Sequence, residues 1–378
     1  MILSEKHKDF QSRVREFAQK EVKVRACEMD MHGEFPWDLV KRLAELQLTA
    51  VYVPKKYGGA GLDTLYYAIA VEEIGRVCGS TGIFLAAHSS LGVFPIYYAG
   101  NEEQKEKWLV PLAKGERIGS FGLTEPDAGS DAAATKTTAI RRGNDYVING
   151  AKRFITSGSI ADVLIITATQ DPSEGYHGIS AFVVEKGTRG LGYGRDEEKL
   201  GLRGSVTSEL TFEDCVIPQG NLLGAEGEGF KIFMETLDGG RISIGALALG
   251  IAQGALDSAL EFARTSKKSG KPTHKAQSIQ SMIAEMATEI EAARLLVYQA
   301  AALKDAGMPY VTEAAMAKYY ASSIGMKAAN MAVDIHGLFG ITDLYPAERF
   351  LRDEKLMEIG EGTSEIQKIV IARQILGK

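Results

Sequence analysis

The hydrophobic pattern of this chain changes twice, and these two changes constrain its fold more than any single motif. Residues 1–118 and 226–378 carry apolar residues at helical spacing, whereas residues 119–225 carry β-rich runs separated by turn signals. The sequence therefore predicts an α+β chain that is mostly α. We expect an N-terminal helical domain, a central antiparallel β domain that resembles a barrel, and a C-terminal four-helix bundle, with these three ranges as the domains.

The individual runs support this plan. In the first segment Phe10, Val14 and Phe17 recur at three- and four-residue steps, and a glycine-rich break follows at 54–62. Further N-terminal helices are expected near 37–48, 64–77 and 102–113. Strands are expected at 146–150, 163–169, 179–185 and 209–216. The helices of the bundle are expected near 230–266, 273–305, 311–337 and 364–377.

Composition excludes several functional classes. The chain has 378 residues and a net charge of −6, and its basic residues are scattered, so no nucleic-acid footprint is present. No uninterrupted apolar run approaches membrane-spanning length, and the N-terminus lacks the apolar core of a signal peptide. The three cysteines form no CxxC pair, which favours a reducing, cytoplasmic location. The six histidines make no HxxxH or HExxH spacing, so we expect no metal site.

The stretch 357–367, MEIGEGTSEIQ, holds the strongest candidate for chemistry. Glu361 lies between Gly360 and Gly362, just before an apolar segment. Burial raises the pKa of a glutamate toward neutrality, which suits a general base. Taken alone, the stretch favours a plainer interpretation, a loop in which Thr363 or Ser364 caps the last helix. The other motifs of the chain favour the base.

Two loops beside expected strands suit a flat ligand. The run 121–131, FGLTEPDAGSD, combines small residues with the hydroxyls of Thr124 and Ser130, so backbone N–H groups can approach a ligand. The run 152–158 places the ring of Phe154 near the hydroxyl of Thr156, which suits a heterocycle. A structural turn and an ordinary strand end are the alternatives. No Walker A loop and no GxGxxG after a strand occurs, so a nucleotide cofactor must be held in another way.

Asp238 and Arg241 precede a long apolar segment. Asp238 could cap that helix, and Arg241 could pair with Asp238 or with an anionic ligand. A local ion pair without function is an equal alternative.

Taken in order, these motifs resemble the acyl-CoA dehydrogenase family, and in particular its short-chain and branched-chain bacterial members. The resemblance covers almost the whole chain, through the stretches 54–62, 100–105, 124–131, 154–158, 199–204, 270–272 and 349–367. It implies a helical domain, a β domain and a four-helix bundle, with FAD between the last two, and a homotetramer. It also implies oxidation of an acyl-CoA thioester to the trans-2-enoyl-CoA, with electrons passed to electron-transferring flavoprotein.

The resemblance assigns roles to individual residues. Glu361 matches the base that removes the α proton. Some members place the base before the arginine that matches Arg241, but that position is Gly240 here, which cannot act. The implied cofactor residues are Phe121, Leu123, Thr124, Ser130, Phe154, Thr156, Gln277, Gly337, Thr363 and Glu365. The implied substrate residues are Ser130, Asp238, Arg241, Gly360 and Gly362.

The sequence departs from the family pattern in two stretches and at two single positions. Ser266 and Ser269 replace an arginine and a phenylalanine that commonly reach a neighbouring subunit's FAD, and 334–338 reads Asp-Ile-His-Gly-Leu instead of Gln-x-x-Gly-Gly. Both changes alter the side expected to hold the adenosine end of FAD. Phe154 replaces the commoner tryptophan, and Gly360 replaces a frequent tyrosine. The lost ring should widen the pocket, so we expect a short, branched or cyclic acyl group.

Two other functions remain open at this stage. The same fold could act as an enoyl-CoA reductase, or as an oxidase that passes electrons to oxygen. A non-catalytic acyl-CoA-binding scaffold without FAD is the third reading, which the altered stretches near 266–269 and 334–338 motivate.

Overall fold

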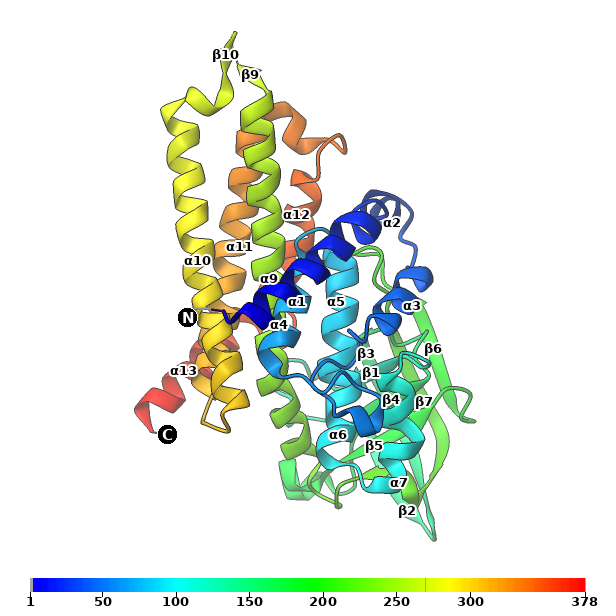
Figure 1. The fold of residues 1–378 in the computed structure, drawn as a ribbon. Coiled ribbons are helices and arrows are strands. Elements are labelled where there is room, and N and C mark those ends of the chain that lie inside the picture. The colour runs from blue at the N-terminus through cyan, green and yellow to red at the C-terminus, as the bar shows by residue number, and fades with distance from the viewer. Residues whose placement is uncertain (1–2, 269, 378) are drawn as a thin grey trace.

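A computed structural model describes residues 3–268 and 270–377. Figure 1 shows a long bundle of C-terminal helices standing beside a group of N-terminal helices, with the β-sheet on the far side of that group from helix α10. The order helical, β, helical agrees with the plan expected from the sequence. Ser269, one of the altered positions noted above, lies outside the described residues.

The N-terminal helices pack around α4 and α5, which are buried nearly all round. Their bounds are α1 Glu5–Phe17, α2 Ala26–His32, α3 Trp37–Glu45, α4 Thr64–Gly75, α5 Gly79–Ala87, α6 Phe94–Ala99, α7 Glu102–Gln104 and α8 Val110–Ala113. A π-helical turn, His88–Val93, joins α5 to α6. The N-terminus of α4 is capped twice. The Asp63 side chain accepts from Tyr66 N at 3.1 Å, and Asp305 accepts from Thr64 N at 2.8 Å.

The sheet has the strand order β6-β7-β3-β2-β4-β5-β8, with β1 paired to β4. The strands are β1 Gly119–Gly122, β2 Thr138–Arg142, β3 Asp145–Thr156, β4 Val163–Thr169, β5 Ile179–Glu185, β6 Leu191–Asp196, β7 Thr207–Pro218 and β8 Leu222–Leu223. The expectation of purely antiparallel pairing is wrong in two places. Strands β1 and β4 run parallel, and β2 pairs in parallel with β4 through Thr138 and Thr169. The β2–β3 hairpin supplies the long crossover that a parallel pair needs.

The C-terminal domain contains the four helices expected from the sequence, three long ones and the shorter α13, together with a further short helix, α12. Its helices are α9 Gly229–Thr265, α10 Gln277–Asp305, α11 Val311–His336, α12 Ala347–Glu354 and α13 Ser364–Leu376. A short hairpin, β9 Lys267–Lys268 and β10 Lys271–Pro272, connects α9 to α10. Helix α13 packs against α11 and buries only Gln367, whereas α12, which the sequence did not indicate, packs against α9 and α11.

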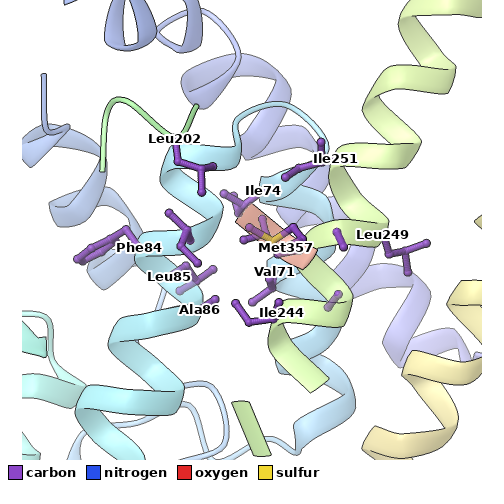
Figure 2. Close-up of a cluster of buried hydrophobic side chains, with 14 of the residues drawn as sticks. Val71, Ile74, Phe84, Leu85, Ala86, Leu202, Ile244, Leu249, Ile251 and Met357 are labelled. Carbon is purple, nitrogen blue, oxygen red and sulfur yellow. The ribbon is translucent and has the colours of Figure 1, made fainter. Parts of the chain in front are cut away.

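Close helix packing joins the first and last domains. The cluster in Figure 2 brings together Val71 and Ile74 of α4, Phe84 of α5, and Ile244 and Ile251 of α9. Glycines allow this approach. A Cβ atom on Gly250 would lie 2.3 Å from the Glu72 carbonyl oxygen, and one on Gly254 would lie 2.2 Å from the Arg76 carbonyl oxygen. Each large side chain buried here stabilises the fold by roughly 1.5–3 kcal/mol.

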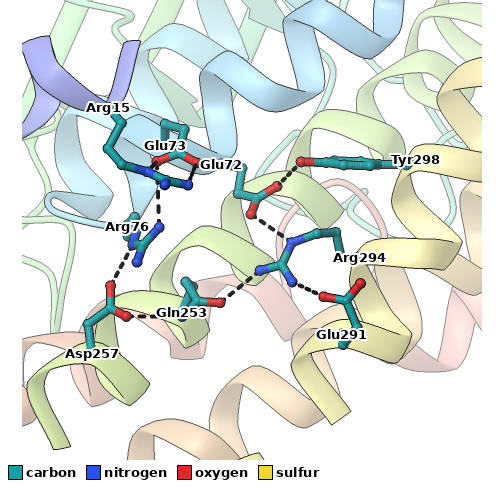
Figure 3. A network of polar contacts seen from close by, with 9 residues as sticks. All are labelled: Arg15, Glu72, Glu73, Arg76, Gln253, Asp257, Glu291, Arg294 and Tyr298. Carbon is teal, nitrogen blue, oxygen red and sulfur yellow. Dashed lines mark hydrogen bonds and ion pairs between the residues drawn. The ribbon is translucent and has the colours of Figure 1, made fainter. Parts of the chain in front are cut away.

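A buried polar network crosses the same helix junction (Figure 3). Glu72 accepts hydrogen bonds from Arg294 at 3.0 Å and from the Tyr298 hydroxyl at 2.6 Å. Glu73 accepts two from Arg15, at 2.6 and 2.8 Å. Further members are Arg76, Gln253, Asp257 and Glu291. The network ties α1, α4, α9 and α10 together, so it fixes the frame in which the site is built.

Two helical stretches have the length and apolar character of membrane spans. They are Gly79–Ala99 and Gly229–Thr265, with mean hydropathies of 1.2 and 1.3. In both, 83% of the most apolar window is buried inside the molecule, as expected of core helices. The expectation that no apolar run approaches membrane-spanning length is therefore wrong. Glycine, alanine and serine fill the gaps between the larger apolar residues of these two helices and make them long enough.

Candidate active site

The segment that carries Glu361 is a strained turn between a 3-10 helix, Lys355–Glu358, and α13. Glu361 has φ of 53° and Gly362 has φ of 91°, so two consecutive residues are left-handed. This conformation costs a non-glycine residue on the order of 1–2 kcal/mol, and such residues cluster at functional sites. The Thr363 side chain caps α13 by accepting from Ile366 N at 3.4 Å. The cap and the candidate base were alternatives from sequence, and the structure contains the cap beside Glu361.

The carboxylate of Glu361 is directed against the backbone of helix α9. A Cβ atom built on Gly240 would lie 2.2 Å from Glu361 Oε2 and 3.6 Å from Leu91 Cδ2. The glycine at the alternative base position therefore provides the space that the Glu361 carboxylate occupies. Leu91 belongs to the π-helical turn, and its neighbour Gly92 packs against the backbone of Gly119 in β1. We call residues 359–363, which carry the candidate base Glu361, the base loop. The base loop, α9, the π-helical turn and β1 thus follow one another in space.

The protonation of Glu361 is set by opposing effects. Glu361 Oε2 is buried and has no hydrogen-bond partner among the described residues. Burial raises the pKa of Glu361 to about 7, and the positive charges of Lys318 and Arg241 limit the rise. A carboxylate with this pKa, free of a hydrogen-bond donor, is suited to accept a proton near neutral pH.

Two buried side chains hold the carbonyl groups of the base loop. Lys318 of α11, which is fully buried, donates from Nζ to the Gly362 carbonyl oxygen at 2.7 Å. The Gln367 side chain donates to the same oxygen at 2.9 Å and to the Glu361 carbonyl oxygen at 3.2 Å. No described residue accepts a hydrogen bond from the Glu361 N–H. Sequence reasoning missed Lys318 and Gln367, and the only available signal for Lys318 was a lysine among alanines.

Asp238 and Arg241 form the ion pair expected from the sequence, one helical turn apart. The expected cap is wrong, however, because α9 begins at Gly229 and Asp238 lies inside the helix. Arg241 is only 6% exposed, and its Nε has no partner among the described residues. Burial raises the pKa of Asp238. Arg241 thus offers a buried, incompletely satisfied guanidinium close to Glu361.

The residues expected beside a flavin ring lie along β1 and β3. The Thr124 carbonyl oxygen accepts from Arg153 N at 2.8 Å, and the Thr156 carbonyl oxygen accepts from Ser120 Oγ at 2.6 Å. Phe121 stacks on Phe233 of α9, with ring centroids 4.0 Å apart. These contacts bring the two loops that sequence reasoning singled out, 121–131 and 152–158, to the same edge of the sheet and against α9.

Lys152 of β3 holds the loop that follows β1. It is fully buried, and its ammonium contacts Glu125 Oε1 at 2.7 Å and the Leu123 carbonyl oxygen at 3.2 Å. The β3–β7 register shifts between Lys152 and Ile155, and Phe154 within that shift has φ of 59° and is 59% exposed. The ring of Phe154 is therefore presented to the exterior by a β-bulge, as at many ligand-binding edges.

Other expected site residues lie elsewhere in the single chain. Gln277 and Gly337 are exposed at the hairpin end of the bundle, about 28 Å along α11 from Lys318 at 1.5 Å per residue. Ser130 is exposed in the loop after β1, and Glu365 is exposed in the first turn of α13. One chain therefore does not bring the whole implied cofactor set together.

The altered positions at the hairpin end have local roles. The Ser266 hydroxyl donates to Thr273 Oγ1 at 2.7 Å and closes the hairpin. Asp334 is exposed and accepts from the Asn330 side chain at 3.4 Å. Beside Glu361, the nearest atoms outside the adjacent residues that a Cβ atom on Gly360 would meet belong to Leu356. They lie at the ordinary contact distances of 3.5–3.9 Å, so Leu356 leaves room for a side chain.

Comparisons with known proteins identify the family. Models of the N-terminal, middle and C-terminal domains of acyl-CoA dehydrogenase match residues 4–116, 120–215 and 227–376. A short-chain specific acyl-CoA dehydrogenase of Clostridium acetobutylicum is 51% identical, and the match covers 96% of each chain. An acryloyl-CoA reductase (NADH) of Anaerotignum propionicum is 49% identical, over 96% of this chain and 92% of that protein.

Solved structures agree with the sequence matches. Butyryl-CoA dehydrogenase from Megasphaera elsdenii has a TM-score of 0.97 at 44% identity, and the match covers 100% of this chain and 99% of that chain. A chain from work on the electron transferring flavoprotein of Acidaminococcus fermentans and flavin-based electron bifurcation has a TM-score of 0.98 at 48% identity, with both chains fully covered. A glutaryl-CoA dehydrogenase from Mycobacterium smegmatis in complex with FADH2 has a TM-score of 0.94 at 31% identity, over 100% and 96% of the chains. The chain belongs to the acyl-CoA dehydrogenase family of flavoprotein oxidoreductases.

Proposed function

We propose that this protein oxidises a short acyl-CoA thioester between its α and β carbons to the 2-enoyl-CoA, with Glu361 as the base that removes the α proton. One observation carries this proposal. Glu361 Oε2 is buried without a hydrogen-bond donor in the space above Gly240, and burial raises its pKa to about 7. A carboxylate stabilised by donors would be a weaker base, and a solvated one would be protonated less readily.

The neighbouring groups suit binding and polarisation of a thioester. The Glu361 N–H is available to donate to the thioester carbonyl oxygen, which increases the acidity of the α proton. Asp238 and Arg241 would hold the CoA portion, and Gly360 and Gly362 would border the acyl group. Arg241 Nε has no protein acceptor among the described residues, so an anionic or carbonyl group of the substrate can accept a hydrogen bond from it.

The edge formed by β1 and β3 fits a flavin. Its exposed aromatic ring at Phe154, the hydroxyls of Thr124 and Thr156, and the buried Phe121 that stacks on α9 match a flat heterocycle with polar edges. We propose that these residues and Leu123 hold FAD, with Ser130 near its phosphates and Thr363 and Glu365 near the N-terminus of α13. When bound, FAD supplies the acceptor for the hydride from the β carbon.

Gln277 and Gly337 would hold the adenosine end of FAD from a neighbouring subunit, since they lie far from Glu361 within one chain. Exposed apolar residues surround this end of the bundle, among them Leu338 at 85%, Phe339 at 51% and Ile341 at 69% exposure. Patches of this kind mark protein interfaces. We propose a cytoplasmic homotetramer, and sedimentation of the yellow protein tests it. A monomer that retains stoichiometric FAD would contradict the proposal.

The missing side chain at Gly360 favours a branched or cyclic short acyl group. Electron-transferring flavoprotein is the proposed electron acceptor, because a chain from work on that flavoprotein is 48% identical to this one. An enoyl-CoA reductase is the second candidate, because the relative named acryloyl-CoA reductase (NADH) is 49% identical. An oxidase would form peroxide during turnover, and a scaffold would purify without yellow colour and would not take up FAD.

The deciding experiment follows the visible spectrum of the purified protein without oxygen while straight, branched and cyclic short acyl-CoAs are added. We expect the flavin band to bleach with at least one of them, and not with any of them in Glu361→Gln. Reduction of an enoyl-CoA by the reduced enzyme, together with no bleaching by any saturated thioester, would favour the reductase. Bleaching that persists unchanged in Glu361→Gln would overturn the assigned base.

A further inference from the structure

Lys318 is buried at the junction of α9 and α11 although the surrounding positions are filled by small apolar residues. It is 0% exposed, and Ala314, Ala317 and Ala321 on the same helix are buried with it. An ammonium in such a place costs considerable free energy compared with an apolar side chain of similar size. Packing alone would therefore favour leucine or methionine, and the charge needs a reason.

The hydrogen bond of this ammonium points to the base loop. Lys318 Nζ donates at 2.7 Å to the carbonyl oxygen of Gly362, the residue directly after Glu361. Its partner is a neutral carbonyl, so the positive charge is not cancelled there. The charged groups that influence Lys318 are Glu361 of the loop, Arg241 of α9, Glu358 of the 3-10 segment and Glu354 of α12. Those that influence Glu361 are Lys318 and Arg241, and the Tyr67 hydroxyl of α4 also faces it.

We propose that Lys318 is a positioning residue for the reaction, which holds the Gly362 carbonyl and supplies the positive charge that keeps Glu361 ionised in its buried position. This inference rests on the function proposed for Glu361. The loop needs both contributions, because Glu361 and Gly362 are left-handed and no described residue donates a hydrogen bond to Glu361 Oε2. Without Lys318, only the charge of Arg241 would oppose the effect of burial on the pKa of Glu361. The pKa would rise, and Glu361 would retain its proton to higher pH.

Gln367 provides a matched control within the same loop. It is fully buried and donates to the Glu361 and Gly362 carbonyl oxygens, so it holds the Gly362 carbonyl that Lys318 also holds, but without a charge. Loss of either side chain removes a tether, but only loss of Lys318 removes a charge. Geometry and electrostatics can therefore be separated by comparing Lys318→Met with Gln367→Leu. Lys318→Arg retains the charge with a different shape.

The experiment measures the protonation of Glu361 directly. Infrared difference spectra of the yellow holoenzyme across pH 5–9 report the band of the protonated carboxyl group, which Glu361→Gln assigns by its loss. We expect a midpoint near 7 in the wild type, a midpoint about one pH unit higher in Lys318→Met, and little change in Gln367→Leu or Lys318→Arg. The rate of flavin bleaching by the acyl-CoA should follow the same midpoints.

Each failure has its own meaning. An unchanged midpoint in Lys318→Met, or an equal shift in Gln367→Leu, would overturn the electrostatic role of Lys318. If Lys318→Met does not fold, Lys318→Arg tests the proposal instead. An unchanged midpoint in Lys318→Arg would support the proposal, because the charge is retained. A midpoint about one pH unit higher in this variant would contradict it. If no acyl-CoA bleaches the wild type, the proposed function fails, but the infrared midpoints still test Lys318.

Discussion

Glu361 and Gly240 share one small volume between the base loop and helix α9. Oε2 of Glu361 lies so close to the Gly240 backbone that a Cβ atom there would stand 2.2 Å away. The two residues are distant in sequence, yet both positions are candidates for the base from the family resemblance. The structure gives a physical reason, since a carboxylate from either position would reach the same space, and only one of the two can hold a side chain there.

Gly240→Ala should therefore disable the base without unfolding the protein. The new methyl group meets the end of a flexible side chain, so the carboxylate moves rather than the helix. A displacement of about 1 Å at a reacting group can lower a rate about 100-fold, and we expect a loss of that order in the rate of flavin bleaching. Circular dichroism and flavin content should remain those of the wild type.

Gly239→Ala is the matched control for this change. It adds the same methyl group to the adjacent position of α9, but there the Cβ atom would meet Lys304 Nζ, at 2.4 Å, instead of Glu361. We expect most of the bleaching rate to survive. Gly240→Glu combined with Glu361→Gly should recover part of the activity that Glu361→Gly alone loses. Equal losses in Gly239→Ala and Gly240→Ala would contradict the shared volume.

The raised pKa of Glu361 predicts that the base destabilises the fold above neutral pH. The pKa of Glu361 is 4.5 in the unfolded chain, and burial raises it to about 7 in the folded protein. Between these values the folded state binds the additional proton, so stability falls as pH rises from about 4.5 to 7 and stays lower above. Glu361→Gln removes this effect, and should stabilise the holoenzyme at pH 8 by on the order of 2 kcal/mol, but not at pH 4.5.

Denaturant unfolding of both proteins at the two pH values measures this difference. The comparison must use equal FAD concentration, since bound cofactor adds its own stabilisation. A stability difference that is the same at both pH values would show that the change acts through packing and not through ionisation.

The sequence predicted those features whose causes are local. The order of helical and β segments follows from periodicity, and the family comparisons confirm the fold class. Glu361 and the Asp238–Arg241 pair stand in short motifs, and the pair is present in the structure. The prediction that Asp238 caps a helix was wrong, because Gly239 and Gly240 indicate a break in the helix that does not occur. Tertiary packing outweighs the roughly 1 kcal/mol cost of each glycine, and α9 continues through them.

Features that depend on distant segments could not be predicted. A lysine in an alanine-rich helix ordinarily faces water, and Lys318 is buried because both α9 and the segment 355–363 pack against α11. The parallel pairing of β1 with β4 likewise depends on where the β2–β3 hairpin lies, not on the alternation within either strand. Gly360 and Gly240 look alike in sequence, but it is Gly240, far away in the chain, whose missing side chain leaves the space that the Glu361 carboxylate occupies.

Gly360→Tyr should narrow the acyl pocket. A Cβ atom at this position makes only ordinary contacts with Leu356, so the substitution is compatible with the backbone. If the absent ring creates room for branches or rings in the acyl group, kcat/KM for such substrates should fall about tenfold or more, and that for butyryl-CoA much less. Parallel assays with butyryl-CoA and isobutyryl-CoA measure the ratio. An equal effect on both substrates would show that Gly360 does not determine acyl shape.

Arg294→Met should destabilise the whole molecule, because it leaves Glu72 buried without its charged partner. Glu72 is 1% exposed, and it retains only the Tyr298 hydroxyl as a donor after this change. Removal of one partner of a buried pair costs about 3–5 kcal/mol, so we expect a clearly lower midpoint in denaturant unfolding of the holoenzyme. Lys8→Met, which breaks the exposed pair with Glu5, is the control and should cost less than about 1 kcal/mol.

The double variant Arg294→Met with Glu72→Gln should be more stable than Arg294→Met, since it removes the uncompensated carboxylate. A double variant that is less stable than the single one would show that Glu72 stabilises the helix junction through its hydrogen bond to Tyr298 more than through its pairing with Arg294.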